Sequence, residues 1–77
     1  MRIEYDREVD ALYIRLQEKH VDRTIEIGDG LNVDFDENGK LIGLEVLDAS
    51  DRYALTDIFN ISTENLFLDD NLARKAG

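Results

Sequence analysis

The chain has 77 residues, and 9 Lys and Arg stand against 18 Asp and Glu, which gives a formal net charge of −9 at pH 7. It contains no Cys, Pro or Trp and a single His. This composition excludes disulfides and thiolate chemistry, and it fits one small acidic domain. A chain of this length buries only a small core, so self-association is a common supplement to its stability.

The charge also restricts the class of partner. Nucleic-acid binding depends on clustered Lys and Arg, and an acidic chain repels both polyanions and anionic membranes. An acidic surface attracts a basic protein instead. No apolar run approaches the ~20 residues that cross a bilayer, and no apolar signal core follows the N-terminus. We therefore expect a cytoplasmic protein that binds protein, either itself or a basic partner, and neither nucleic acid nor membrane.

Five stretches of the first two thirds alternate between apolar and polar residues, which is typical of half-buried strands in an antiparallel sheet. They cover residues 3–5, 12–16, 25–27, 31–35 and 42–46. The polar breaks between them are too short for helical crossovers. Gly28-Asp29-Gly30 is interpreted as a bend within one long third strand. The expected sheet is therefore a four-stranded antiparallel meander.

Asn38-Gly39 gives the strongest local signal in the chain. Asn-Gly between two alternating runs predicts a hairpin with a type I′ turn, in which both central residues take positive φ. The resulting register pairs Glu37 with Lys40, Phe35 with Ile42, Val33 with Leu44 and Leu31 with Val46. All six apolar side chains then lie on one face of the sheet, and a shift by one residue would destroy this agreement.

After Leu47 the apolar period changes to that of a helix. Ser50 is the expected N-cap, and Ala54, Leu55, Ile58 and Phe59 form an apolar stripe in a helix that ends near Asn60. Packed on the apolar sheet face, this one helix would close a two-layer α+β core. The predicted domain covers residues 1–60. Residues 61–77 form a C-terminal tail, expected to contribute to a dimer, whose pattern allows either a further helical turn or a short strand.

Residues 34–45 match the EF-hand pattern D-x-[DN]-x-[DN]-G-x5-E, with Asp34, Asp36, Asn38 and Glu45 as the cation ligands. An EF-hand needs a helix before the loop, whereas the preceding residues alternate like a strand. In the hairpin register Glu45 lies about 13 Å further along the sheet than the turn acids. We therefore favour a hairpin with solvated acids and no metal, and calcium binding is the alternative function.

Asp6, Glu8 and Asp10 crowd one turn, and paired carboxylates can carry acid–base chemistry when one of them is buried. A charged loop between adjacent strands is the simpler interpretation. His20 lies in a second charged turn, and there is no second His and no Cys. No hydrolase or redox set can be assembled from these residues, so we expect no enzymatic activity and no cofactor.

The sheet face opposite the predicted helix carries apolar residues among its charges. Exposed apolar groups rimmed by charge mark interaction surfaces, although scattered surface leucines are also common. The tail carries a second apolar patch. The candidate interface residues are Tyr13, Leu41, Leu47, Leu66, Phe67 and Leu68.

Two stretches together resemble a known family. Residues 5–14, YDREVDALYI, are similar to an N-terminal signature YD-x-x-x-D-x-L-Y-I, and residues 30–50, GLNVDFDENGKLIGLEVLDAS, resemble its continuation. The signature is that of a widespread prokaryotic family of very short domains of unknown function. The resemblance implies a small antiparallel sheet followed by a helix, with no established activity. Members are sometimes proposed as antitoxin-like partners of small basic proteins encoded beside them.

Charge, composition and resemblance lead to one functional hypothesis. The chain is expected to be a non-enzymatic protein-interaction domain that binds itself or neutralises a small basic protein.

Overall fold

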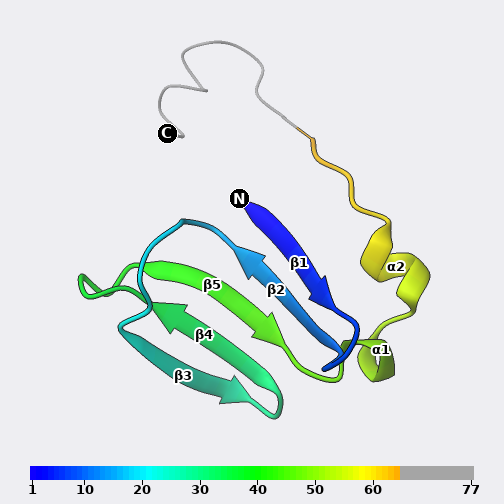
Figure 1. Cartoon of the computed structure of the whole chain (residues 1–77), viewed down its shortest axis with the longest axis horizontal. Coiled ribbons are helices and arrows are strands. Elements are labelled where there is room, and N and C mark those ends of the chain that lie inside the picture. The colour runs from blue at the N-terminus through cyan, green and yellow to red at the C-terminus, as the bar shows by residue number, and fades with distance from the viewer. Residues whose placement is uncertain (65–77) are drawn as a thin grey trace.

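The computed structural model describes residues 1–64 and has the α+β architecture that the sequence predicts. Five strands form one antiparallel sheet, and two short helices follow them (Figure 1). The elements are β1 (Arg2–Asp6), β2 (Ala11–Arg15), β3 (Arg23–Gly28), β4 (Leu31–Phe35), β5 (Leu41–Val46), α1 (Ala49–Arg52) and α2 (Leu55–Phe59). Within the described part of the chain, neither helix has the length and apolar character needed to cross a bilayer.

The strands are ordered β1-β2-β5-β4-β3 across the sheet, so β5 enters between two hairpins (Figure 1). The predicted four-stranded meander is therefore wrong in both strand number and order. The prediction joined residues 25–35 into one bent strand, but β3 and β4 are separate strands that pair with each other. Gly30 makes this reversal with φ 73, a conformation that glycine adopts without steric cost. The turn is held by hydrogen bonds to its carbonyls from the Leu47 amide, at 2.8 Å, and from the Arg52 guanidinium.

The hairpin between β4 and β5 forms at Asn38-Gly39 as predicted, but its turn type differs. Gly39 has φ 80, whereas Asn38 does not take positive φ. The Gly39 amide donates to the Asp36 carbonyl at 3.0 Å, and the Asp36 amide donates to the Lys40 carbonyl at 2.9 Å. This is a type I turn followed by a glycine bulge. The Asp36 carboxylate favours it, because it accepts the amides of Asn38 and Lys40, both at 2.9 Å.

The bulge shifts the register only near the turn. Val33 faces Leu44 and Leu31 faces Val46, as predicted. Phe35 faces Leu41 instead of Ile42, because the turn is one residue longer than predicted. A bulge at Ile42, opposite the step from Asp34 to Phe35, then restores the predicted register. The apolar side chains nevertheless remain on one face.

The single predicted helix is broken into α1 and α2. Tyr53 and Ala54 are extended, with ψ of 148 and 141, so the chain changes direction between the two short helices. Ser50 is not the N-cap. Asp48 occupies that position with φ 52 and no capping side-chain hydrogen bond, while the Ser50 hydroxyl donates to Asp10 at 2.7 Å.

The helices cover only one end of the sheet. In Figure 1 both helices lie next to β1, at the edge of the sheet away from β3. The Phe59 ring of α2 meets the Tyr5 ring edge-on, with the centroids 5.5 Å apart. The buried apolar side chains of the described residues are only Ile42, Val46, Ala49 and Ile58. The expected two-layer core is therefore small: α2 packs beside β1 and β2, Ile42 and Val46 of β5 are buried, and neither helix covers β3 and β4.

Candidate functional site

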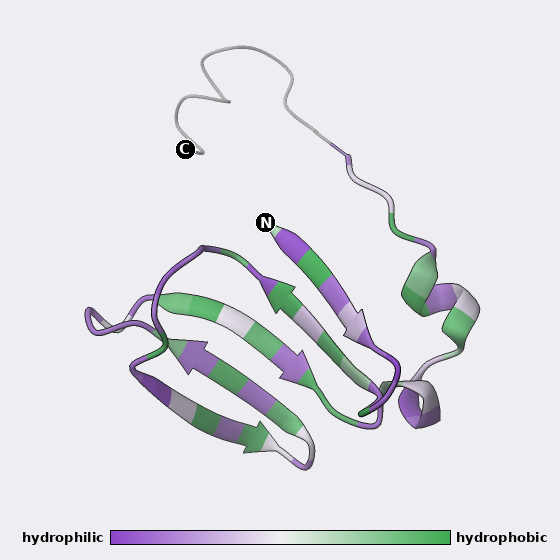
Figure 2. Cartoon of the chain, viewed as in Figure 1, coloured by the Kyte–Doolittle hydropathy of each residue, from purple (hydrophilic) through white to green (hydrophobic). Residues whose placement is uncertain are grey.

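An unbroken row of apolar residues crosses all five strands. The pairing aligns Ile3 with Ile14, Ile14 with Leu44, Leu44 with Val33, and Val33 with Ile25. We call this side of the sheet the open apolar face. The pairing also places Leu12, Leu31 and Phe35 on this side. Leu16, just beyond β2, and Ile27, at the bulge between Glu26 and Gly28, follow Ile14 and Ile25 onto it by alternation. In Figure 2 apolar bands recur along every strand. The sequence predicts this face correctly, but as the inside of a covered core.

Much of the open apolar face is in contact with solvent. Ile25 and Ile27 on β3 are 42% and 61% exposed, and Leu16 is 46% exposed. Val33 and Leu44, in the middle of the sheet, are only half-buried. Single exposed apolar residues are normal on protein surfaces, but contiguous apolar patches mark sites of interaction. The open apolar face is therefore a contiguous apolar patch that is partly exposed to solvent.

The face continues into a groove beside α2. The groove has a volume of about 220 Å³. Its lining is Ile3, Leu12, Ile14, Tyr53, Asp57, Ile58 and Ile61, so Asp57 is the one acidic member. Since Ile3 and Ile14 belong to both surfaces, the groove and the open apolar face form one continuous apolar region.

The opposite face is polar and hydrogen-bonded within itself. Tyr13 donates its hydroxyl to Asp34 at 2.6 Å, and Thr24 donates to the other oxygen of the same carboxylate at 2.5 Å. The Arg15 guanidinium lies 4.8 Å from the centre of the Tyr13 ring. Burial, together with the Asp34 carboxylate, raises the pKa of Tyr13 to about 12. Tyr13 is therefore a neutral hydrogen-bond donor that ties β2 to β4 across β5.

Tyr13 spans β5 because Gly43 has no side chain. A Cβ atom at Gly43 would lie 2.6 Å from the Cε1, Cζ and hydroxyl oxygen of Tyr13. Sequence reasoning missed this packing, although a glycine in the middle of an apolar strand is a signal for the close approach of another group.

The predicted interface residues do not form one patch, and Leu41 pairs with Phe35 of the open apolar face. Tyr13 is half-buried and engaged with Asp34. Leu41 is 36% exposed at the start of β5, whereas Leu47 is half-buried just beyond its end. Leu66, Phe67 and Leu68 lie outside the described residues. The larger apolar surface is the one on the opposite side of the sheet.

The acids of the EF-hand pattern have separate partners. Strand β4, not a helix, leads into them. Asp34 is bonded to Tyr13 and Thr24, and Glu45 accepts a hydrogen bond from Asn32 at 3.1 Å. Among residues 1–64, no three or more His, Cys, Asp and Glu side chains gather where they could hold a metal ion.

Asp36 is the buried acid of that pattern, at 7% exposure. The Lys40 amide above all, and then the Asn38 amide and the Gln17 side chain, hold the pKa of Asp36 below its usual range. Its carboxylate is therefore occupied by the hairpin that contains it. Asp36 also lines a polar hollow of about 220 Å³ together with Lys19, His20, Asp22, Glu37 and Asn38. His20 is exposed there, as the sequence predicts.

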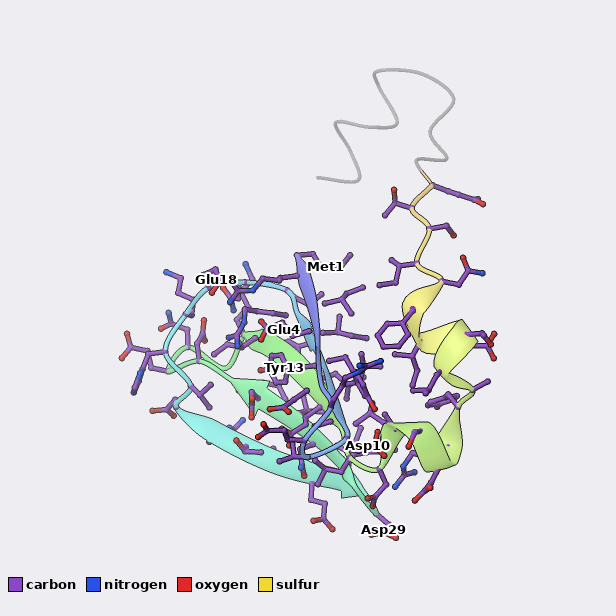
Figure 3. The ribbon with its side chains drawn as sticks, turned by 45° about the vertical axis from the view of Figure 1, so that its right-hand side comes forward. Met1, Glu4, Asp10, Tyr13, Glu18 and Asp29 are labelled. Carbon is purple, nitrogen blue, oxygen red and sulfur yellow. The ribbon has the colours of Figure 1, made fainter. Side chains whose placement is uncertain are left out.

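The acids of the first turn are likewise separate. Asp6 accepts the Glu8 amide at 2.9 Å. Asp10 has φ 55 and accepts the Tyr5 hydroxyl at 2.5 Å, together with the amide and hydroxyl of Ser50. The Tyr5 bond first, and then the Ser50 bonds, lower the pKa of Asp10. Asp10 therefore joins the β1–β2 turn to the start of α1, at the end of the sheet seen in Figure 3.

This junction explains part of the sequence resemblance in structural terms. Tyr5 and Asp10 belong to the first motif, and Ser50 ends the second. Asp10 and Ser50 are 40 positions apart in the sequence. With Tyr5 they nevertheless form one hydrogen-bonded cluster.

Comparison with known proteins identifies relatives of unknown function. The model of a family described as "Protein of unknown function (DUF2283)" matches residues 2–50, which span the sheet and the start of α1. Over 66 residues the chain is 35% identical to Uncharacterized protein MJ0789 of Methanocaldococcus jannaschii, which covers 86% of this chain and 51% of that protein. The chain thus spans about half the length of this curated relative. No solved structure matches the chain.

Proposed function

Since the chain belongs to the DUF2283 family, whose function is unknown, we propose from its surfaces that it is a non-enzymatic protein-interaction domain. Its partner is either a second copy of itself or a small basic protein, which it neutralises in the manner of an antitoxin. The observation that carries the proposal is the open apolar face, because a row of apolar residues crosses five strands and the described helices leave β3 and β4 uncovered.

The free energy of covering this face supports an interaction role. Full burial of an Ile side chain contributes about 1.5–3 kcal/mol. Ile25 and Ile27 are each about half exposed, so a partner that covers them would gain about 1 kcal/mol from each. A small domain with four buried apolar residues within residues 1–64 has little stability to spare, and a gain of about 2 kcal/mol is large compared with that stability.

A basic partner is supported by the charge of the chain. The net charge is −9, and Glu4, Glu26, Asp34 and Glu45 project from the polar side of the sheet. Such a surface steers a cationic protein toward it and speeds association at low salt. Calcium binding through Asp34, Asp36, Asn38 and Glu45 has no such support, because Asp34 is bonded to Tyr13, Glu45 to Asn32, and Asp36 to backbone amides of its own turn.

The test is the composition and mass of complexes formed by the full chain. A tagged copy expressed in its native cell is purified at low and at high salt, and the purified chain is measured by light scattering. We expect either a self-associated species or a stoichiometric basic protein whose capture weakens as salt rises. A chain that is strictly monomeric and captures no protein at either salt concentration would remove the proposal.

A further inference from the structure

We propose that two copies of the chain stack through their open apolar faces to form a symmetric two-layer homodimer. The inference rests on the proposed interaction function and names its surface and its partner. It differs from the interface that the sequence predicts, because Tyr13 lies on the polar side and Leu47 lies beyond the end of β5, whereas Leu41 pairs with Phe35 of the open apolar face.

The distribution of charge selects a second copy as the occupant of this face. Among the described strand residues on this side, Arg23 carries the one charge, and its guanidinium lies 5.3 Å from the centre of the Phe35 ring. The strand acids project from the opposite side. A basic protein would find no carboxylate among these strand residues, whereas a second copy meets apolar surface with apolar surface. Two acidic chains also approach each other with least repulsion through the sides that hold the fewest charges.

The size of the face fits this partner. Five strands about 4.8 Å apart, with about five residues each at 3.3 Å, give a flat footprint of roughly 400 Å². Exposed residues of α2 and the segment after it, such as Tyr53 and Ile61, border the same groove and extend it. Part of this footprint lies beside α2, and two such faces with the bordering residues bury on the order of 1,000 Å², which is the lower limit for a specific interface.

The geometry is also a familiar one for sheets. Two sheets pack face to face about 10 Å apart with their strands within about 30° of parallel. A two-fold axis relates the two chains, so both contribute the same face to the interface and every contact occurs twice. Because each face is then fully used, no third chain can add to the assembly. The second sheet supplies the layer that α1 and α2 do not provide over β3 and β4.

Sedimentation equilibrium and light scattering on the full chain test the inference with two charge-matched variants of β3. Ile25→Lys with Ile27→Lys adds two positive charges on the open apolar face. Glu26→Lys changes the net charge by the same +2, on the same strand, but on the polar side. All three residues are exposed, so a folded monomer depends little on them. We expect a wild-type dimer, a dimeric Glu26→Lys variant, and a Kd at least about 100-fold weaker for the double variant.

A second measurement on the wild-type chain keeps the test independent of how the variants fold. Methyl NMR shifts on dilution should change at Ile14, Val33 and Leu44, in the central strands. Shifts confined to β3 would indicate edge-to-edge pairing and would overturn the inference.

The outcomes separate the two proposals. A monomeric wild-type chain that captures a basic protein overturns the dimer and leaves the interaction function standing. A dimer that persists in the Ile25→Lys, Ile27→Lys variant with unchanged affinity places the interface elsewhere and also overturns it. A monomeric chain without any partner removes both.

Discussion

The contact between Tyr13 and Gly43 predicts that Gly43→Ala destabilises the fold, although alanine is usually better than glycine in a strand. The new Cβ would lie 2.6 Å from three atoms of the Tyr13 ring and hydroxyl. Ordinary contact begins near 3.4 Å, so the ring must move by about 0.8 Å. That movement breaks the 2.6 Å hydrogen bond from Tyr13 to Asp34.

The magnitude follows from three terms. Loss of a hydrogen bond to a carboxylate costs about 1.5 kcal/mol at a partly buried site, and crowding the ring costs about 1 kcal/mol. The lower entropy of the unfolded alanine chain offsets about 0.5 kcal/mol. Gly43→Ala should therefore lower the free energy of unfolding by about 2 kcal/mol, which is a shift of roughly 8–16 °C in Tm for a domain of this size.

Urea denaturation followed by circular dichroism measures this loss, with two controls. Gly28→Ala should be nearly neutral, because its Cβ would lie 3.4 Å from Leu31, an ordinary contact. In a Tyr13→Ala background the Gly43→Ala penalty should vanish, because no ring remains to be displaced. If Gly43→Ala is as stable as the wild type, or is equally damaging without Tyr13, the packing argument is refuted.

Three further predictions concern the turns and the ionisable groups. Gly39→Ala should cost about 1–2 kcal/mol in urea denaturation because of its φ of 80, whereas Asn38→Ala should cost less than about 0.5 kcal/mol; equal losses would indicate the type I′ turn instead. Asp10 has its pKa lowered from the ordinary 3.8, so its contribution to stability is present above that pH and is lost as pH falls through the lowered value. Asp10→Asn should therefore flatten the acid limb of the stability curve, and an unchanged limb would contradict the role of Asp10. Tyr13 has its pKa raised from 10.0 to about 12, so its contribution is present below pH 10 and is lost between pH 10 and 12; an absorbance titration should show one tyrosinate step near pH 12 that Tyr13→Phe abolishes.

The candidate site was partly predictable. The apolar set that forms the open apolar face can be read from the alternation of residues 25–27, 31–35 and 42–46 alone, because side chains of a strand alternate between its two sides. Its exposure could not be predicted, because it depends on where α2 lies. The stripe Ala54, Leu55, Ile58 and Phe59 predicts one short helix packed on the apolar sheet face, but the extended Tyr53 and Ala54 divide the segment into α1 and α2.

The hydrogen-bonded clusters were not predictable for a related reason. Asp10 and Ser50 are 40 positions apart, and Tyr13 and Asp34 are 21 apart. Each pair meets only because β5 lies between β2 and β4. From sequence spacing alone, such acids can be assigned only to turns or to metal-binding patterns. Their actual partners lie on other strands, and the local pattern does not give the order of the strands in the sheet.

The sequence by itself determined the local features: five alternating stretches, a reversal at Asn38-Gly39, and one side of the sheet that is apolar. These features follow from side-chain period and from the backbone freedom of glycine, which act over a few residues. The tertiary structure alone decided the order β1-β2-β5-β4-β3, the division of the helix, and which side of the sheet stays uncovered. Those outcomes depend on hydrogen bonds and packing between segments that are distant in the sequence. The free energy of each such contact depends on the others, because they form together when the whole chain folds.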